Sequence, residues 1–110
     1  MVGDIQKDLE KRVKTFDLAI SLINKGKDRE AIPHLKRLLE LEPTNTGARY
    51  YLGSIFLEQD ELARAAYHFN IIIKLDPRYV AAYYKLGLAY EKQGKIEEAR
   101  NCFENAVKIP

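Results

Sequence analysis

The chain has 110 residues, and its landmarks recur every 34 residues along most of that length. When the sequence is shifted by this period, small and large apolar residues fall into shared columns. Four columns are Leu18, Leu52, Leu86; Ala19, Gly53, Gly87; Ala31, Ala65, Ala99; and Leu35, Phe69, Phe103. A repeat of this length forms one helical hairpin that cannot bury its own apolar face, so neighbouring hairpins must stack. The repeat therefore predicts an all-α chain, and such a stack favours binding over catalysis.

Six amphipathic segments follow from the i, i+3, i+4 spacing of apolar residues. We expect helices over about residues 4–25, 29–41, 46–59, 62–75, 80–93 and 96–109. Asp4 is the expected N-cap of the first helix, which is longer than its counterparts and so carries an N-terminal extension. Gly26, Asp60 and Gly94 follow the odd-numbered helices, where a left-handed residue commonly ends a helix. Pro33 is expected just inside the second helix, with at most a small kink.

The aligned columns also predict the core. Small residues at two positions of each repeat allow the paired helix axes to approach closely. Large apolar columns surround them: Leu18, Leu52, Leu86; Leu22, Phe56, Tyr90; Leu35, Phe69, Phe103; Leu38, Ile72, Ala106; and Leu41, Leu75, Ile109.

These columns resemble the tetratricopeptide repeat, a 34-residue helix–turn–helix with a characteristic order of aromatic, Leu-Gly, Tyr, Ala, Phe and Pro positions. The third repeat carries Tyr83, Leu86, Gly87, Tyr90, Gly94, Ala99 and Phe103. The resemblance implies a right-handed superhelical stack of three antiparallel helix pairs in one domain, residues 1–110. Its parts would be an extension (1–11) and repeats at 12–45, 46–79 and 80–110. No capping helix follows the third repeat, so we expect a fragment of a longer protein.

The family resemblance also implies a concave groove, lined by the first helix of each pair, that binds peptides. Phe16, Tyr50 and Tyr84 share one groove position and form an expected aromatic ladder, which favours an apolar or amphipathic segment. An alternative is that these aromatic rings pack on one another without a ligand. The expected groove residues are Val13, Phe16, Ile20, Ile23, Tyr50, Tyr51, Ser54, Leu57, Tyr84, Lys85, Leu88, Glu91 and Lys92.

One partner class of the family is not expected. Co-chaperone members bind the terminal carboxylates of heat-shock chaperones with Lys, Asn and Arg side chains at five groove positions. The matching positions here hold Phe16, Ile20, Tyr51, Ala81 and Lys85, of which only Lys85 is cationic.

Composition narrows the function further. Eighteen basic and sixteen acidic residues give a net charge of +2 with no basic block, so a nucleic-acid partner is not expected. No apolar run approaches the ~20 residues that span a bilayer. A lone cysteine, Cys102, forbids an internal disulfide and fits a reducing, cytoplasmic setting. His34 and His68 share its column, but stacked helices lie too far apart for one metal centre.

The sequence contains no phosphate-binding loop and no catalytic constellation, so we expect a protein that is not an enzyme and needs neither a cofactor nor a metal. The favoured function is a non-catalytic adaptor or scaffold module with a protein or peptide partner. Two alternatives stay open. One is a self-assembly element that forms a homo-oligomer through the N-terminal helix or the last hairpin. The other is the targeting arm of a larger enzyme.

Overall fold

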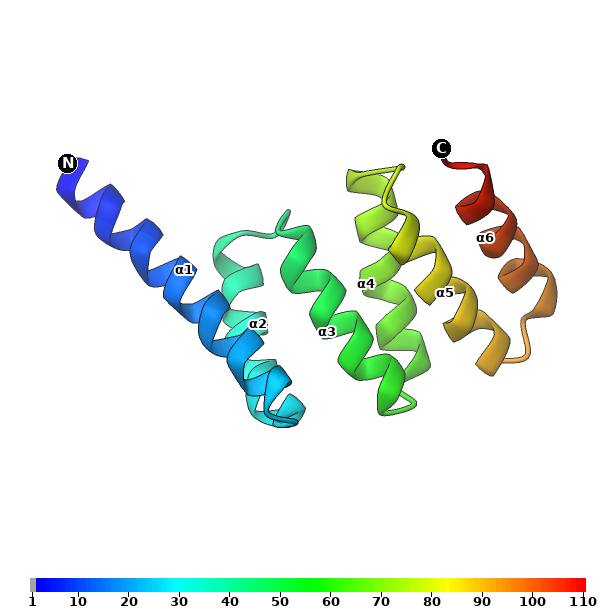
Figure 1. Ribbon diagram of the computed structural model, residues 1–110, viewed down its shortest axis with the longest axis horizontal. Coiled ribbons are helices and arrows are strands. Elements are labelled where there is room, and N and C mark those ends of the chain that lie inside the picture. The colour runs from blue at the N-terminus through cyan, green and yellow to red at the C-terminus, as the bar shows by residue number, and fades with distance from the viewer. Residues whose placement is uncertain (1) are drawn as a thin grey trace. The chain divides into compact units, whose positions relative to one another are not determined.

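The computed structural model describes residues 2–110, and this part of the chain contains six helices and no strand (Figure 1). The helices are α1 (Val2–Asn24), α2 (Asp28–Leu41), α3 (Thr46–Glu58), α4 (Leu62–Leu75), α5 (Val80–Lys92) and α6 (Ile96–Lys108). Every expected boundary lies within two residues of the observed one. The all-α class is therefore confirmed. None of the described helices combines the length and apolarity needed to cross a bilayer.

The helix ends follow the predicted turn chemistry. Gly26, Asp60 and Gly94 adopt φ values of 76°, 60° and 79°, so the left-handed turn is confirmed in all three repeats. In each turn the next residue donates its N–H to the carbonyl five residues earlier, as Glu61 does to Phe56 at 2.8 Å. The expected N-cap at Asp4 is wrong, because α1 begins at Val2 and Asp4 lies within the first turn.

The chain divides into two compact units. Unit 1 ends at Ala48 and contains α1, α2 and the first residues of α3. Unit 2 is Arg49–Pro110 and contains the rest of α3 with α4, α5 and α6. A single domain and a right-handed superhelix therefore stay predictions.

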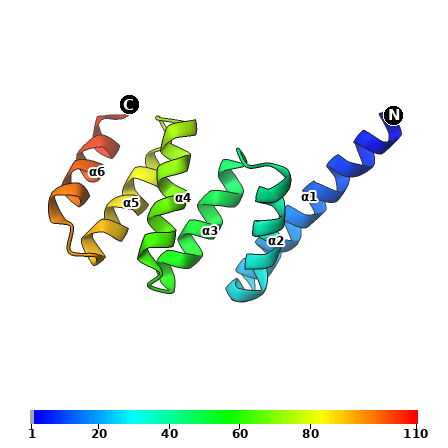
Figure 2. The same cartoon turned by 180° about the vertical axis from the view of Figure 1, so that it is seen from behind.

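In unit 1, α1 and α2 pack as an antiparallel pair, and the N-terminal part of α1 continues beyond the end of α2 (Figures 1 and 2). Ala19, Ala31, Leu35 and Leu38 form the core between the two helices and are at most 1% exposed. Leu18 was expected in this core, but it is 46% exposed. No described helix precedes α1 to cover it, whereas the equivalent Leu86 faces helices on both sides of α5.

In unit 2, glycine lets the paired helices approach closely. A Cβ atom at Gly87 would lie 2.5 Å from Cε1 of Phe103, and one at Gly53 would lie 3.0 Å from Phe69. Phe69 and Ile72 are fully buried beside Leu52, as the columns predict.

The prediction for the last large column of the core is wrong in part. Leu41 and Leu75 are 41% and 43% exposed, because each ends its helix where the chain leaves the pair.

Candidate functional site

Unit 1 contains a cleft of about 200 Å³ beside the middle of α1. Two of the expected groove residues, Val13 and Phe16, lie in its wall, and Val13 is 58% exposed. Phe16 is half-buried and also reaches the start of α3, where a Cβ atom at Gly47 would lie 3.2 Å from its ring. The lining residues are Leu9, Arg12, Val13, Phe16, Asp17, Leu38, Glu42 and Asn45.

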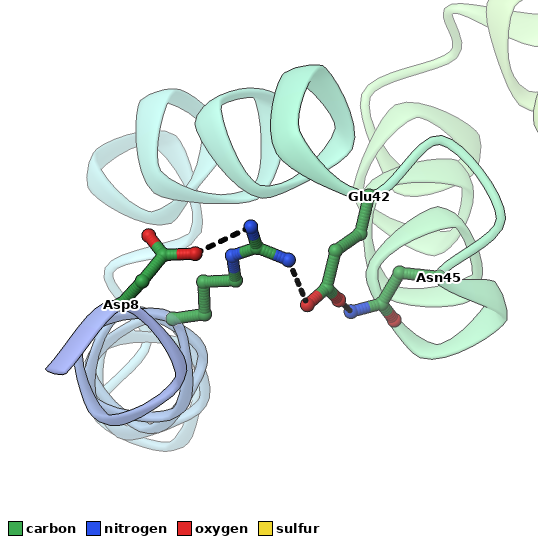
Figure 3. A network of polar contacts seen from close by, with 4 residues as sticks. Asp8, Glu42 and Asn45 are labelled. Atoms are coloured by element: carbon green, nitrogen blue, oxygen red, sulfur yellow. Dashed lines mark hydrogen bonds and ion pairs between the residues drawn. The ribbon is translucent and has the colours of Figure 1, made fainter. Parts of the chain in front are cut away.

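A polar network forms one rim of this cleft (Figure 3). Arg12 pairs with Asp8 along α1 and donates to Glu42 Oε1 at 3.2 Å. Asn45 Nδ2 donates to Glu42 Oε2 at 3.0 Å, and Asn45 Oδ1 accepts the Ala48 N–H at 2.9 Å. Hydrogen bonding to Glu42, with a further contribution from Asp8, raises the pKa of Arg12. The network thus fixes the guanidinium between α1 and the turn that leads into α3.

The sequence analysis missed this rim. The signal for it was a charged residue, Arg12, among the apolar residues of α1, together with an Asn just before a helix start, where side-chain caps are common. The two remaining expected residues of unit 1, Ile20 and Ile23, are half-buried further along α1. Neither lines the cleft.

In unit 2, Tyr50 is at the centre of an aromatic cluster. Its ring centroid lies 5.8 Å from those of Tyr51 and Tyr79 and 6.2 Å from that of Phe69. The ammonium of Lys85 lies 5.8 Å from the same ring, within the range of a cation–π contact. Tyr50 is half-buried by these neighbours, so much of its surface serves packing, as the alternative interpretation holds.

Tyr79 is a member of this cluster that the sequence analysis did not select. Burial raises the pKa of its phenol, and the nearby Tyr50, Tyr51 and Asp76 raise it further. The phenol of Tyr79 is therefore protonated, and so uncharged, at neutral pH. The only sequence signal was its place, since it aligns with Asn45 at the end of the repeat.

Several expected groove residues of α5 are more exposed than Tyr50. Tyr84 is 52% exposed, with one side of its ring near Phe103 at a centroid distance of 5.9 Å. Leu88 lies one turn further along and is half-buried. Glu91 is exposed, and Lys92 Nζ lies 3.7 Å from Asp60 Oδ1. These side chains combine apolar surface with charge at one end.

Two expected groove residues of α3 differ in character. Leu57 is only 6% exposed, so it offers a ligand little surface. Ser54 is half-buried, and its hydroxyl has no hydrogen-bond partner among the described residues. Phe16 lies in unit 1, while Tyr50 and Tyr84 lie in unit 2, so a continuous ladder of the three stays a prediction.

No metal or nucleophilic site emerges from the part of the chain that the structure describes. Between residues 2 and 110, no three His, Cys, Asp or Glu side chains group closely enough to hold a metal ion. Cys102 is buried, and this burial raises the pKa of its thiol. At neutral pH the sulfur is therefore the protonated thiol, which is the poorly reactive form.

Comparison with known proteins gives a consistent family assignment. Residues 16–80 match one family profile described as Tetratricopeptide repeat, and residues 80–109 match a second with the same description. No curated protein matches the sequence.

Solved structures give strong matches to the fold. MamA is 30% identical with a TM-score of 0.86, and the match covers 97% of this chain but 63% of that chain. YrrB, described as a tetratricopeptide repeat (TPR) protein with an unusual peptide-binding site, is 26% identical with a TM-score of 0.81. The match covers 86% of this chain and 49% of that chain. The second TPR of Spaghetti (RPAP3), solved with an HSP90 peptide, is 21% identical with a TM-score of 0.87. The match covers 97% of this chain and 99% of that chain.

Proposed function

Because the chain belongs to the tetratricopeptide repeat family, we propose that it is a non-catalytic adaptor or scaffold module that binds an apolar or amphipathic peptide segment. The bound segment would lie along the first helices of the pairs, in contact with the expected groove residues of each unit. A lone cysteine suits a reducing compartment, and we assign the module to the cytoplasm on that ground.

The observation that carries this proposal is the exposed ring of Tyr84. An aromatic side chain that is 52% exposed offers a large contact area with only two torsions to immobilise. Leu88 extends its apolar surface along α5, while Lys85, Glu91 and Lys92 supply charge that would orient a partner. Residues of this kind are typical of the few anchors that provide most of the binding energy.

The cleft of unit 1 supports the same proposal. Its wall of Leu9, Val13 and Phe16 is apolar, and its rim of Arg12 and Glu42 is fixed by hydrogen bonds. A small apolar recess with an ordered polar edge suits one side chain of an amphipathic segment.

The comparisons support a peptide partner but not its identity. YrrB is described as having a peptide-binding site, and this chain spans about half of its length. The domain from RPAP3, with its HSP90 peptide, shares the fold alone at 21% identity. Here Phe16, Ile20, Tyr51 and Ala81 replace the polar side chains of a carboxylate clamp. We therefore propose a partner that is recognised by apolar side chains and not by its terminal carboxylate.

The test compares two exposed tyrosines. A library of amphipathic helical peptides is screened by fluorescence anisotropy, and the tightest binder is titrated against Tyr84→Ala and Tyr67→Ala. Tyr67 is a matched control, because it is 60% exposed on α4, the second helix of its pair. We expect Tyr84→Ala to weaken binding by more than about tenfold, roughly 1.4 kcal/mol, and Tyr67→Ala to leave it unchanged. Equal effects of the two variants, at unchanged melting temperatures, would reject the assigned surface.

A further inference from the structure

A second cleft lies in unit 2, at the surface shared by α4, α5 and α6, and we call it the α4–α6 cleft. Its volume is about 290 Å³, and α5 lies between the other two helices (Figures 1 and 2). Its apolar lining consists of Ile73 on α4, Tyr83, Leu86 and Tyr90 on α5, and Cys102 on α6. A recess that is smaller than a typical small-molecule pocket has room for one side chain of a partner.

The α4–α6 cleft is separate from the proposed groove. Tyr83, Leu86 and Tyr90 follow one another at intervals of three and four residues, which places them on one face of α5. The groove residues Tyr84 and Leu88 share a different face of the same helix. An occupant of the cleft therefore leaves the surface of Tyr84 free, so the two sites are independent.

The preceding helix pair shows what fills the equivalent place on α3 and α4. His68 aligns there with Cys102, and Phe56 aligns with Tyr90. The His68 ring stacks on Phe56 at a centroid distance of 5.9 Å and an interplanar angle of 18°. Its Nδ1 lies 3.3 Å from a guanidinium nitrogen of Arg49. An aromatic ring thus covers the residues of α3 whose counterparts on α5 line the α4–α6 cleft.

The last helix pair has the same platform without the ring. The side chain of Cys102 is much shorter than that of a histidine, and within residues 2–110 no aromatic ring stacks on Tyr90. Both tyrosines of the cleft are nevertheless fixed. Tyr83 donates its hydroxyl to the Pro77 carbonyl at 2.9 Å, and the Tyr90 hydroxyl accepts from Asn70 Nδ2 at 3.3 Å. The cleft is therefore open, and its aromatic wall is pre-organised for a ring.

A cation accompanies the aromatic platform in both pairs and leaves room for that ring. Arg64 Cζ lies 5.6 Å from the ring centroid of Phe56, and Lys95 Nζ lies 5.6 Å from that of Tyr90. Phe56 contacts the cation and the stacked His68 ring at the same time. Lys95 therefore does not take the place of the missing ring beside Tyr90.

The rim of the cleft indicates which kind of ring fits. Glu98, Asn101 and Asn105 line the cleft along α6 and are exposed. The two amides offer hydrogen-bond donors and acceptors, while the charge of Glu98 is opposed by that of Lys95, three residues earlier. These groups favour a ring with an uncharged polar tip, which is the character of a tyrosine side chain.

From these features we infer that the α4–α6 cleft binds one tyrosine side chain of a partner chain. Its ring stacks on Tyr90 as His68 stacks on Phe56, and its hydroxyl reaches the amides of the rim. A stacked aromatic pair contributes beyond the apolar area that it buries. The cleft is thus a second contact site, on the opposite side of the module's α5 from no residue that the proposed groove requires, and it selects for a ring.

The test is a titration of the full chain with N-acetyl-tyrosinamide, followed by the backbone amide shifts in nuclear magnetic resonance spectra. We expect saturable shifts at the residues that line the cleft. N-acetyl-leucinamide is the matched probe without a ring, and we expect it to bind more than about tenfold more weakly.

Two substitutions at one residue test the place of the ring. Cys102→His supplies the missing ring from within the chain and should weaken the binding of N-acetyl-tyrosinamide by more than about tenfold. Cys102→Ser is the matched control, because it is of similar size, leaves the cleft open and should preserve the affinity. Circular dichroism melts verify the fold of each variant. If Cys102→His loses the fold, Tyr90→Leu decides the question, since it removes the platform and should weaken binding to a similar extent.

Three results would overturn the inference. The first is the absence of saturable shifts in the cleft, or shifts around Tyr84 alone, which would assign the probe to the proposed groove. The second is equal affinity for the tyrosine and leucine probes. The third is unchanged affinity in a folded Cys102→His or Tyr90→Leu variant.

Discussion

The turn that leads into α3 and the turn that leads into α5 share one backbone design but differ in their side chains. In both, the last residue donates its N–H to the carbonyl three residues earlier, Asn45 to Glu42 at 3.0 Å and Tyr79 to Asp76 at 3.1 Å. Asn45 then caps α3 through the Ala48 N–H and joins the network of Arg12. Tyr79 makes no side-chain cap, and its ring packs on Tyr50.

This difference shows how one repeat position can serve two kinds of site. An amide at this position produces a polar rim beside the cleft of unit 1. A phenol at the same position produces the tyrosine cluster of unit 2, where Asp76 fixes the turn by accepting the Arg78 N–H at 3.1 Å. The repeat thus fixes the backbone, while the identity of the last residue decides whether its surroundings are polar or aromatic.

A second contrast concerns the close approach within each pair. In the first pair Ala19 and Leu35 occupy the positions that Gly87 and Phe103 occupy in the last. The larger ring of Phe103 leaves no space for a methyl group at Gly87, whereas Ala19 is fully buried beside a smaller neighbour. The first pair thus combines a larger residue on α1 with a smaller one on α2, and the last pair does the reverse on α5 and α6. The first pair therefore predicts that Gly87→Ala would be tolerated together with Phe103→Leu.

The largest predicted effect follows from this exchange. Gly87→Ala puts a methyl group within 3.0 Å of three ring atoms of Phe103. Overpacking of this severity costs about 3 kcal/mol, and the better helix propensity of Ala returns about 1 kcal/mol. We expect a net loss of about 2 kcal/mol in the free energy of unfolding, measured by urea denaturation.

The second variant makes the last pair resemble the first. In the background of Phe103→Leu, Gly87→Ala should be neutral or stabilising, because Leu leaves the space that Leu35 leaves beside Ala19. A double-mutant cycle measures the coupling. If Gly87→Ala costs the same in both backgrounds, the ring of Phe103 is not what requires glycine.

An intermediate effect is predicted for Asn45, the residue that distinguishes the two turns. Asn45→Ala removes the cap of α3 and the donor to Glu42, and the loss of a cap typically costs about 1 kcal/mol. Asn45→Ser keeps an acceptor for the Ala48 N–H and should recover most of this loss. Thermal and urea melts of the two variants make the comparison. Equal destabilisation by Ala and Ser would mean that the contact with Glu42, and not the cap, provides the stability.

The repeat period predicted the helices, the left-handed turns and most of the core, because these depend on periodicity and on residue size at fixed columns. The environment of the groove residues was harder to predict. Tyr50 and Tyr84 share a column, yet Tyr50 is surrounded by Tyr51, Phe69 and Tyr79, while Tyr84 has Phe103 beside it and stays half exposed. A column reports the position of a residue on its own helix, but its exposure depends on the neighbouring helices and turns. The Arg12 network was missed for the same reason, since it joins residues thirty positions apart.

The smallest predicted effect concerns the left-handed residue that ends α3. Asp60 holds φ at 60° where Gly26 and Gly94 occupy the same position in the other repeats. Asp60→Gly relieves the contact of its Cβ in this conformation and should stabilise the protein by about 0.5 kcal/mol in urea melts. The exposed ion pair with Lys92 at 3.7 Å is lost as well, but such pairs contribute little. Asp60→Asn separates the two contributions, because Asn tolerates the left-handed region and also lacks the charge. If both variants destabilise the protein equally, the ion pair with Lys92 outweighs the backbone strain, and the middle turn differs in energy from its two counterparts.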